Sequence, residues 1–447
     1  MRKVSRVVVL INERDTIMRT IALVSEHASP LAPPGSVDSG GQNIYVANLA
    51  RELAAQGNRV DVFTRLDDPS LPRILAWQPG VRVVHVPAGP PRPIPKEALL
   101  PYMDQFAAFM LHYFRNNWPT YDIVHANFFM SGLAALPATR EFGVPLVMTF
   151  HALDRVRRKH QGSADGFPAE RYAIELELVR RADKLVAECP QDLQDLVEHY
   201  AADPAKIDII PCGFDAGELT PMDRTAARVK LGWDPNRFTL LQLGRMVPRK
   251  GVDNVIRALG ILRRRHGVDA ALRVVGGDAP RPDDIATPEL CRLRGIAAQA
   301  GVEDAVSFCG RCGRDRLSLF YGACDVFVTT PWYEPFGITP VEAMACARPV
   351  VGAAVGGIRS TVVDGKTGYL VAPRDPEALA ERLAYLAAHE QTARRLGRNG
   401  LRRAQKMFTW SGVARDMMRA YAGLAQAPAA PRRHRHGQAT EVALAAK

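Results

Sequence analysis

The chain has 447 residues, enough for two or three domains that each bury a core of their own. Hydrophobic residues make up 47% and charged residues 23%, which is ordinary for a globular protein and excludes a fibrous or wholly disordered one. The seven cysteines are scattered and no apolar run approaches the ~20 residues that span a bilayer, so we expect reduced thiols in a cytoplasmic protein.

The formal net charge of +11 fits a nucleic-acid partner, an anionic membrane surface or an acidic small substrate. The basic residues are spread along the chain, and no aromatic RNA-binding motif accompanies them. We therefore expect no nucleic-acid partner. An anionic substrate, together with peripheral attraction to an anionic membrane, accounts for the charge.

The chain shows its first strand pattern at residues 20–25, directly after Met18. We interpret residues 1–17 as an N-terminal extension, and the sequence leaves open whether translation begins at Met1 or at Met18. The alternative is that residues 7–11 add an edge strand to the first domain.

Strand and helix patterns alternate through the first half of the chain, with further strands at residues 59–63, 81–86, 122–126 and 146–150. This alternation predicts an α/β domain with a mostly parallel, doubly wound sheet, in which ligands bind outside the carboxyl ends of the strands. Gly40 and Gly41 stand between the first strand and a helix that begins near Gln42. They let the backbone approach a ligand closely, although any tight turn can use such a pair.

Three histidines fall at the expected strand ends: His27, His125 and His151. A hydrogen-bonded structural role is the default interpretation for each of them. A basic run at residues 155–160 follows, and its place at the cleft rim favours an anionic ligand or a lipid phosphate over the alternative of a solvated surface. We assign four residues to the binding of this anionic acceptor: Arg157, Arg158, Lys159 and Arg171.

A turn-rich junction at residues 211–215 leads to a second domain, which opens with a strand pattern at residues 239–243. Arg245 and Lys250 follow that strand, and two fixed cations can neutralise a diphosphate without a metal. We place Arg249 at the surface beside them. Cys309 and Cys312 have metal-site spacing but no second pair, so we expect no metal ligand set and leave any redox role open.

The most informative stretch covers residues 330–371 and follows a buried strand at residues 325–329. A turn leads into a helix near Thr339, which would leave the N–H groups of Phe336, Gly337 and Ile338 free to bind an anion such as phosphate. Glu334 and Glu342 flank this helix start. In isolation they would be a solvated carboxylate and a complement to the helix dipole.

The motifs E-P-F-G-I-x-x-x-E, EAMA, PVV, VGG and DGKTGYLV in this stretch resemble the donor-binding signature of retaining, nucleotide-sugar-dependent glycosyltransferases of family four. The resemblance runs from Met18 to about Trp410, and the segment DSGGQ at residues 38–42 matches the branch of sucrose synthases and inositol-phosphate transferases. It implies the GT-B architecture, in which two Rossmann-like doubly wound domains face each other across a cleft.

The resemblance also implies roles for individual residues. Arg245 and Lys250 clamp the donor diphosphate, Glu334 binds the far hydroxyls of the sugar, Glu342 holds the ribose, and His151 contacts the transferred sugar. The expected catalytic residues are His151, Arg245, Lys250 and Glu334. The expected donor-binding residues are Gly40, Gly41, Arg245, Lys250, Glu334, Phe336, Gly337, Ile338 and Glu342.

The implied domain organisation has an acceptor-side domain at residues 18–212 and a donor-side domain at residues 213–405. A helix at residues 406–426 crosses back to the first domain, and residues 427–447 form a disordered tail. The family commonly has Gly where Ala347 stands, so a left-handed backbone there would cost roughly 1 kcal/mol.

The expected activity is transfer of a hexose from a nucleoside diphosphate, UDP being favoured, to a hydroxyl with retention of anomeric configuration and without a metal or other cofactor. The acceptor is left open among a small phosphorylated molecule, a glycolipid and a polysaccharide. Alternatives are a nucleotide-sugar epimerase or sugar phosphorylase on the same fold, and a non-catalytic nucleotide-sugar-binding protein.

Overall fold

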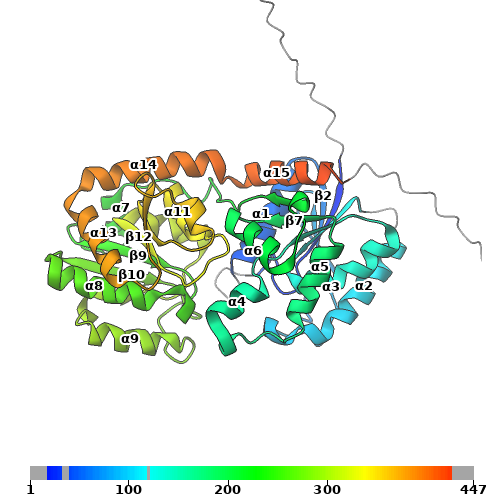
Figure 1. The fold of residues 1–447 in the computed structure, drawn as a ribbon, viewed down its shortest axis with the longest axis horizontal. Coiled ribbons are helices and arrows are strands. Elements are labelled where there is room, and N and C mark those ends of the chain that lie inside the picture. Colours follow the sequence, from blue (N-terminus) through cyan, green and yellow to red (C-terminus); the bar gives the residue numbers. More distant parts are fainter. Residues whose placement is uncertain (1–17, 33–39, 118–120, 425–447) are drawn as a thin grey trace, which may run out of the picture.

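The computed structural model describes residues 18–32, 40–117 and 121–424. The interpretations of residues 1–17, of Asp38 and Ser39, and of the tail beyond residue 426 lie outside these ranges. Two α/β domains stand side by side (Figure 1). The prediction of two doubly wound, mostly parallel sheets is confirmed.

The first domain has an eight-stranded sheet in the order β3-β4-β2-β1-β5-β6-β7-β8. All its pairings are parallel except the one between β3 and β4. Its strands are β1 (Thr20–Val24), β2 (Arg59–Arg65), β3 (Ile74–Gln78), β4 (Val81–Val86), β5 (Ile123–Asn127), β6 (Leu146–Thr149), β7 (Lys184–Ala187) and β8 (Ile207–Ile209). The edge strand β3 was missed: its sequence ILAWQ begins with four apolar residues but does not alternate, and none of its residues is buried.

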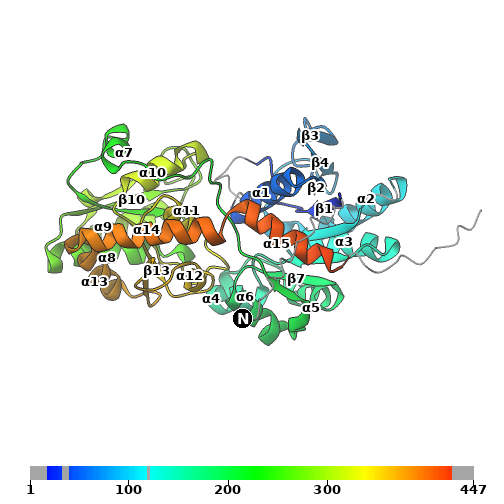
Figure 2. The same cartoon turned by 90° about the horizontal axis from the view of Figure 1, so that it is seen from above.

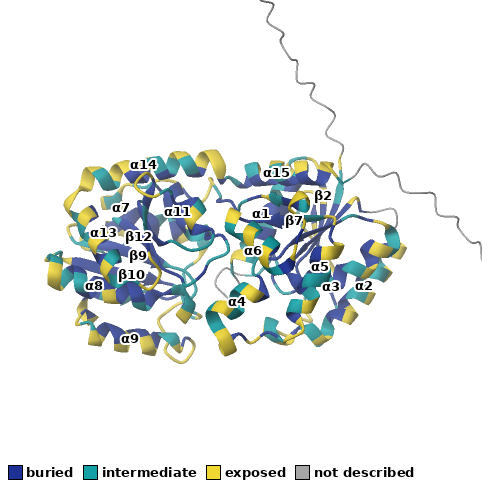
Figure 3. Cartoon of the chain, in the orientation of Figure 1, coloured by how far each residue is buried: buried dark blue, intermediate teal, exposed yellow. Residues whose placement is uncertain are grey.

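Helices cover both faces of this sheet. They are α1 (Gly41–Ala55), α2 (Met103–Asn116), α3 (Phe129–Phe142), α4 (Asp154–Gln161), α5 (Arg171–Arg181) and α6 (Pro190–Tyr200). Helix α1 buries Val46, Leu49 and Leu53 completely, as its spacing predicts. Figure 3 shows the buried strands at the centre of each domain and exposed residues on the outer helix faces.

The second domain has a six-stranded parallel sheet in the order β11-β10-β9-β12-β13-β14. Its strands are β9 (Phe238–Leu243), β10 (Ala270–Val275), β11 (Val306–Phe308), β12 (Val326–Thr329), β13 (Val350–Ala353) and β14 (Gly368–Val371). Its helices are α7 (Arg224–Leu231), α8 (Val252–His266), α9 (Glu289–Gln299), α10 (Leu317–Ala323), α11 (Ile338–Ala345), α12 (Ile358–Thr361), α13 (Pro376–Ala388) and α14 (Glu390–Met407).

The chain crosses between the domains twice. Helix α15 (Trp410–Ala422) continues the line of α14 along one edge of the molecule and lies over the first domain (Figures 1 and 2). The N–H of Phe214 donates to the carbonyl of Phe408 at 2.8 Å, so the two crossings run beside each other. Tyr421 of α15 then meets His125 of β5, with 2.7 Å between the hydroxyl and Nδ1.

Candidate active site

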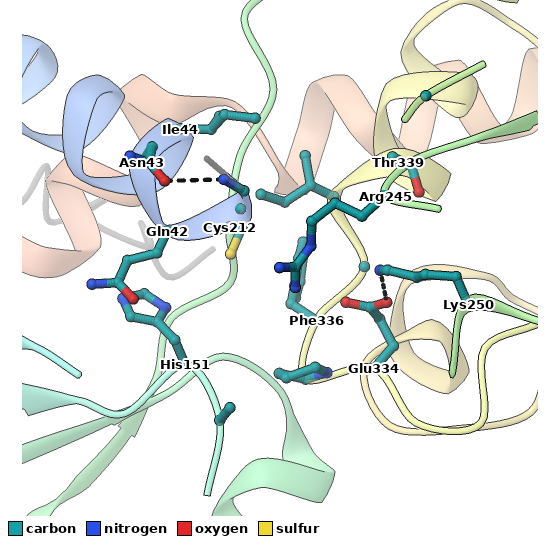
Figure 4. A pocket seen from close by; sticks show the side chains of 18 of the residues that line it. Gln42, Asn43, Ile44, His151, Cys212, Arg245, Lys250, Glu334, Phe336 and Thr339 are labelled. Atoms are coloured by element: carbon teal, nitrogen blue, oxygen red, sulfur yellow. Dashed lines mark hydrogen bonds and ion pairs between the residues drawn. The ribbon is translucent and has the colours of Figure 1, made fainter. Parts of the chain in front are cut away.

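A cavity of about 320 Å³ lies where the carboxyl ends of the strands of both domains meet. Every expected catalytic and donor-binding residue lines it: Gly40, Gly41, His151, Arg245, Lys250, Glu334, Phe336, Gly337, Ile338 and Glu342. In Figure 4, Arg245, Lys250 and Glu334 face Gln42 and His151 across this space.

Three basic side chains surround one carboxylate on the second-domain wall. The Lys250 ammonium forms an ion pair with the Glu334 carboxylate, and Arg245 and Arg249 line the cavity beside them. Burial would raise the pKa of Glu334, but the charges of Lys250, Arg249 and Arg245 outweigh burial and hold this pKa below its ordinary value. Burial lowers the pKa of Lys250, which the charge of Glu334 opposes only in part. Among the described residues, Arg249 and Lys250 thus face one carboxylate, and this part of the wall suits an anion.

The expectation that Arg249 lies at the surface is wrong, because its side chain lines the cavity. Its guanidinium stacks on the Tyr333 ring at 5.2 Å, and its Nη1 is buried without a hydrogen-bond partner among the described residues. An unpartnered buried guanidinium nitrogen in a cavity wall is costly unless a ligand completes it. The prediction for Arg249 was wrong because the spacing of Arg245 and Lys250 does not indicate where a side chain between them points.

The start of α11 adds backbone donors to this cluster. Gly337 caps the helix with φ of 90°, a conformation that favours glycine. The N–H groups of Phe336, Gly337 and Ile338 have no partner among the described residues. The loop is held from behind by the VGG motif, where the N–H of Gly357 donates to the Glu334 carbonyl at 3.0 Å and a Cβ on Gly357 would lie 2.3 Å from the Phe336 carbonyl oxygen.

The first domain reaches the same point through Gly40 and Gly41. A Cβ on Gly40 would lie 3.9 Å from Nε of Arg245, and one on Gly41 would lie 3.4 Å from Cδ1 of Ile338. The glycine pair therefore lets the start of α1 approach the cationic cluster of the other domain, as the sequence predicts.

Glu342 occupies the far end of the cavity, where it is 2% exposed. The Tyr321 hydroxyl donates to its Oε2 at 2.9 Å, and Nη1 of Arg314 lies 3.5 Å from its Oε1. Two protein donors thus fix the carboxylate while it still faces the cavity, as a hydroxyl-binding role requires.

His151 lies across the cavity from the cations, with a φ of 57° that is rare for a residue other than glycine. Its Nδ1 is 2.9 Å from Oε1 of Glu188, and its Nε2 is 3.0 Å from Oδ1 of Asn127. The thiol of Cys212 donates to the same Glu188 oxygen at 3.1 Å. The sequence analysis missed Glu188, although a carboxylate directly after β7 is a signal that could have found it.

The four residues that were expected to bind an anionic acceptor do not lie together in the structure. Arg157 lines the main cavity, where it pairs with Asp165 at 2.9 Å. Lys159 lines a separate cavity of about 220 Å³ behind Tyr333. Arg158 turns away to Asp154, since the basic run is helical and its side chains diverge.

Arg171 requires a second correction, because its side chain is completely buried and is absent from the wall of either cavity. It pairs with the equally buried Glu175 at 2.7 Å and stacks on Phe128 and Phe167, which do line the main cavity. Its Nη1 has no partner among the described residues. Arg171 therefore supports the wall from behind instead of contacting a ligand directly.

Of the remaining candidates, Cys312 lines the main cavity, whereas His125 and Cys309 do not. His125 is completely buried between Tyr421 and Thr149, outside the cavity. Cys309 and Cys312 are free thiols, and burial raises the pKa of Cys312 to about 11. Within the described ranges no group of three or more His, Cys, Asp or Glu residues has a geometry that could hold a metal ion. Nor do these ranges include a helix that is long and apolar enough to cross a bilayer.

Comparison with known proteins gives concordant matches. Residues 39–218 match the family model described as Glycosyltransferase Family 4, and residues 223–403 match Glycosyl transferases group 1. The chain is 37% identical to a D-inositol 3-phosphate glycosyltransferase of Geodermatophilus obscurus over 93% of its own length and 92% of the relative. It is 36% identical to the protein of that name from Actinosynnema mirum, over 90% and 97% of the two chains.

Among solved structures, a sucrose-phosphate synthase from Thermosynechococcus elongatus superposes with a TM-score of 0.83. The two sequences are 32% identical, and the match covers 91% of this chain and 99% of the other.

Proposed function

The chain belongs to the family-four glycosyltransferases of the GT-B architecture, and we propose that it moves a hexose from a nucleoside-diphosphate sugar to a hydroxyl of a small phosphorylated acceptor. The observation that carries this proposal is the positive charge beside α11, where Arg249 and Lys250 lie by the Glu334 carboxylate and Arg249 has a buried nitrogen without a partner among the described residues. A diphosphate there would meet these cations and the free N–H groups of the helix start.

We assign the ribose and the sugar of the donor to other residues that line the cavity. Glu342 faces the cavity beyond the cluster and accepts hydrogen bonds from the ribose hydroxyls. Glu334 accepts from the far hydroxyls of the sugar, and His151 lies near the anomeric carbon. Glu188 holds the His151 ring, because Nδ1 and Oε1 are 2.9 Å apart. We favour UDP as the nucleotide, in line with the DSGGQ branch of the family.

The transfer proceeds with retention of the anomeric configuration. Glu334 is paired with Lys250, and Glu188 is bound by His151 and Cys212, so neither is a free nucleophile for a covalent intermediate. The leaving diphosphate instead takes the proton of the acceptor hydroxyl on the face from which it departs. Lys250 and Arg245 stabilise the departing charge, so no metal ion is needed.

The acceptor lies against the first domain. Arg157 and Lys96 line that wall of the cavity, where they pair with Asp165 and Glu97. The relatives named above act on inositol 3-phosphate or make sucrose phosphate, which supports a phosphorylated polyol or sugar. The phosphate would lie beside Arg157, with a hydroxyl directed to the donor.

The test is to incubate the protein with UDP-glucose and D-inositol 3-phosphate, in EDTA, and to follow UDP release and the anomeric proton of the product by NMR. We expect UDP release that depends on the acceptor, and a product with the donor's α configuration. A β product would exclude retention, and a requirement for added metal would exclude a metal-free site. Release of UDP without acceptor would favour the epimerase or a hydrolytic activity, and nucleotide binding without turnover on a wider panel of hexoses and acceptors would favour a binding protein.

A further inference from the structure

His27 lies in the cavity wall directly after β1, and the proposed function gives it no role. Its ring is held by Glu26, with 2.7 Å between Nδ1 and Oε1, and the Glu26 side chain is completely buried. Ser131 of α3 donates to the other carboxylate oxygen, while its Oγ accepts from the N–H of Glu26 at 3.0 Å. The carboxylate is therefore fixed on both sides, and it fixes the orientation of the imidazole.

The pairing leaves one ring nitrogen available. Among the described residues, His27 is the only basic side chain that pairs with Glu26, and a buried carboxylate requires such a partner. Nδ1–H thus donates to Glu26 whether the ring is neutral or protonated. Nε2 has no hydrogen-bond partner within the described ranges, and the ring lines the cavity.

A continuous aromatic wall connects His27 to Arg157. The His27 ring meets the edge of Phe128 at 5.0 Å, Phe128 meets Phe167 at 5.6 Å, and the Arg157 guanidinium lies over Phe167 at 4.9 Å. Phe128 has a φ of 87°, which for a bulky residue is tolerated only where the surroundings enforce it. The buried guanidinium of Arg171, 4.8 Å from the Phe128 ring, is part of those surroundings.

We propose that His27 is an acceptor-binding residue whose Nε2 forms a hydrogen bond to an oxygen of the phosphorylated polyol or sugar, and that Glu26 is its positioning residue. The proposal rests on the proposed function, because it requires the acceptor to occupy the first-domain wall. It assigns His27 to the acceptor hydroxyls and Arg157 to the phosphate. It also explains why a carboxylate is buried behind the cavity with a histidine as its basic partner among the described residues.

Two substitutions separate contact with the acceptor from a merely structural role. In His27→Asn the side-chain amide reaches the position of Nδ1, so the bond to Glu26 survives and the group that faces the cavity is lost. In His27→Gln the amide reaches the position of Nε2. If His27 contacts the acceptor, H27N binds it more weakly than H27Q; if His27 only holds Glu26, the order is reversed.

The measurement is calorimetric titration of UDP-saturated protein with D-inositol 3-phosphate, and separately with fructose 6-phosphate. We expect H27N to weaken the binding of the probe that the wild type accepts by about tenfold, and H27Q by less, with UDP affinity unchanged in both. Glu26→Gln should weaken it by a smaller factor than H27N. His199→Asn is the matched histidine control, because His199 lines only the smaller cavity.

Acceptor affinity in H27N that equals that of the wild type, or that is not below that of H27Q, would overturn the assignment of His27 while leaving the proposed function intact. A parallel loss of UDP affinity would overturn it too, since His27 would then act on the donor side. A wild-type protein that binds UDP but neither phosphorylated probe would overturn the acceptor class of the proposed function, and the His27 proposal with it.

Discussion

The two walls of the cavity are built in different ways. The donor wall takes all its predicted charged groups from two short segments, residues 245–250 and 334–342, each of which follows one strand of the second sheet. Further charged side chains, of Asp278, Arg311 and Arg314, line it from other loops. The acceptor wall takes His27, Lys96, Phe128, Arg157 and Phe167 from five separate loops and helix ends of the first domain. Site residues that come from one short segment form a motif that can be recognised in the sequence. Site residues that come one by one from distant segments form no such motif, and only the fold shows that they lie together.

If the two walls bind different substrates, damage to the donor wall should reduce turnover or nucleotide affinity, while damage to the acceptor wall should change the affinity for the acceptor only. Lys250→Ala should lower kcat by about 100-fold or more, because it removes a fixed charge that stabilises the departing diphosphate. Steady-state kinetics with saturating acceptor would measure this. Lys250→Arg, which keeps the charge, is the matched control, and a normal kcat in Lys250→Ala would show that the cluster is not the diphosphate site.

Glu342→Ala should weaken nucleotide binding by roughly 30-fold, since a charged hydrogen bond is lost and Tyr321 and Arg314 lose their partner. Titration with UDP would measure the change. Tyr321→Phe serves as the control, because it removes one support of the carboxylate and leaves the carboxylate itself. Full nucleotide affinity in Glu342→Ala would remove Glu342 from the ribose site.

The first domain contains a buried histidine, His125, which should make the stability of the protein depend on pH. Burial, with a smaller contribution from His151, lowers the pKa of His125 from its ordinary value of 6.5 to about 3. The unfolded chain therefore binds one more proton between these values, so stability rises with pH across this window and is lost on acidification. At pH 5 the loss should be about 2 kcal/mol relative to pH 7.5.

Guanidinium denaturation of the wild type and His125→Asn at pH 7.5 and pH 5.0 would test this. The variant should be less sensitive to the change of pH by the same amount, even if it is less stable at both values. An identical pH dependence in the two proteins would mean that His125 is protonated in the folded state.

On the acceptor wall, Arg157→Ala should raise the acceptor KM by about tenfold and leave the donor KM unchanged, because of the two substrates only the acceptor loses a partner. The buried Asp165 carboxylate also loses its partner, so the variant's thermal stability is measured alongside. The next residue supplies the control: Arg158 points to Asp154, so Arg158→Ala should leave both values near those of the wild type. If both variants changed the donor KM instead, the division of the cavity into two walls would be wrong.

The smallest effect concerns Ala347, which follows α11 with a φ of 56°. The sequence raised the question of a left-handed backbone here, and the structure confirms it. Ala347→Gly should stabilise the protein by up to about 1 kcal/mol, the relief of strain being offset in part by the freedom of glycine in the unfolded chain. Thermal unfolding would measure the shift.

Ala201, with a φ of 51° at the end of α6, offers the matched substitution in the first domain. Ala201→Gly should raise the stability of that domain by a similar amount. Ala345→Gly inside α11 should instead destabilise the protein, and a gain there would contradict the explanation by backbone conformation.

The two sheets, most strand positions and the motif residues of the donor wall could be predicted from the sequence. Apolar strands alternate with amphipathic helices, and the residues of the donor wall are close enough in the chain for local geometry to bring them together. Arg245, Lys250, Glu334, Gly337 and Glu342 therefore all lie where their motifs predict. Strand β3 was not predicted, because its short run ILAWQ lacks the alternation of a half-buried strand.

Which basic residues face the cavity could be learned only from the fold. Arg157, Arg158 and Lys159 are consecutive, yet their helix directs them to the main cavity, to Asp154 and to the smaller cavity. Neither Arg249 nor Arg171 lies where it was expected. Arg249 lines the cavity instead of the outer surface, and Arg171 is buried behind the cavity wall. The directions of side chains on a short helix depend on what packs against it, and that is set by contacts between segments far apart in the chain.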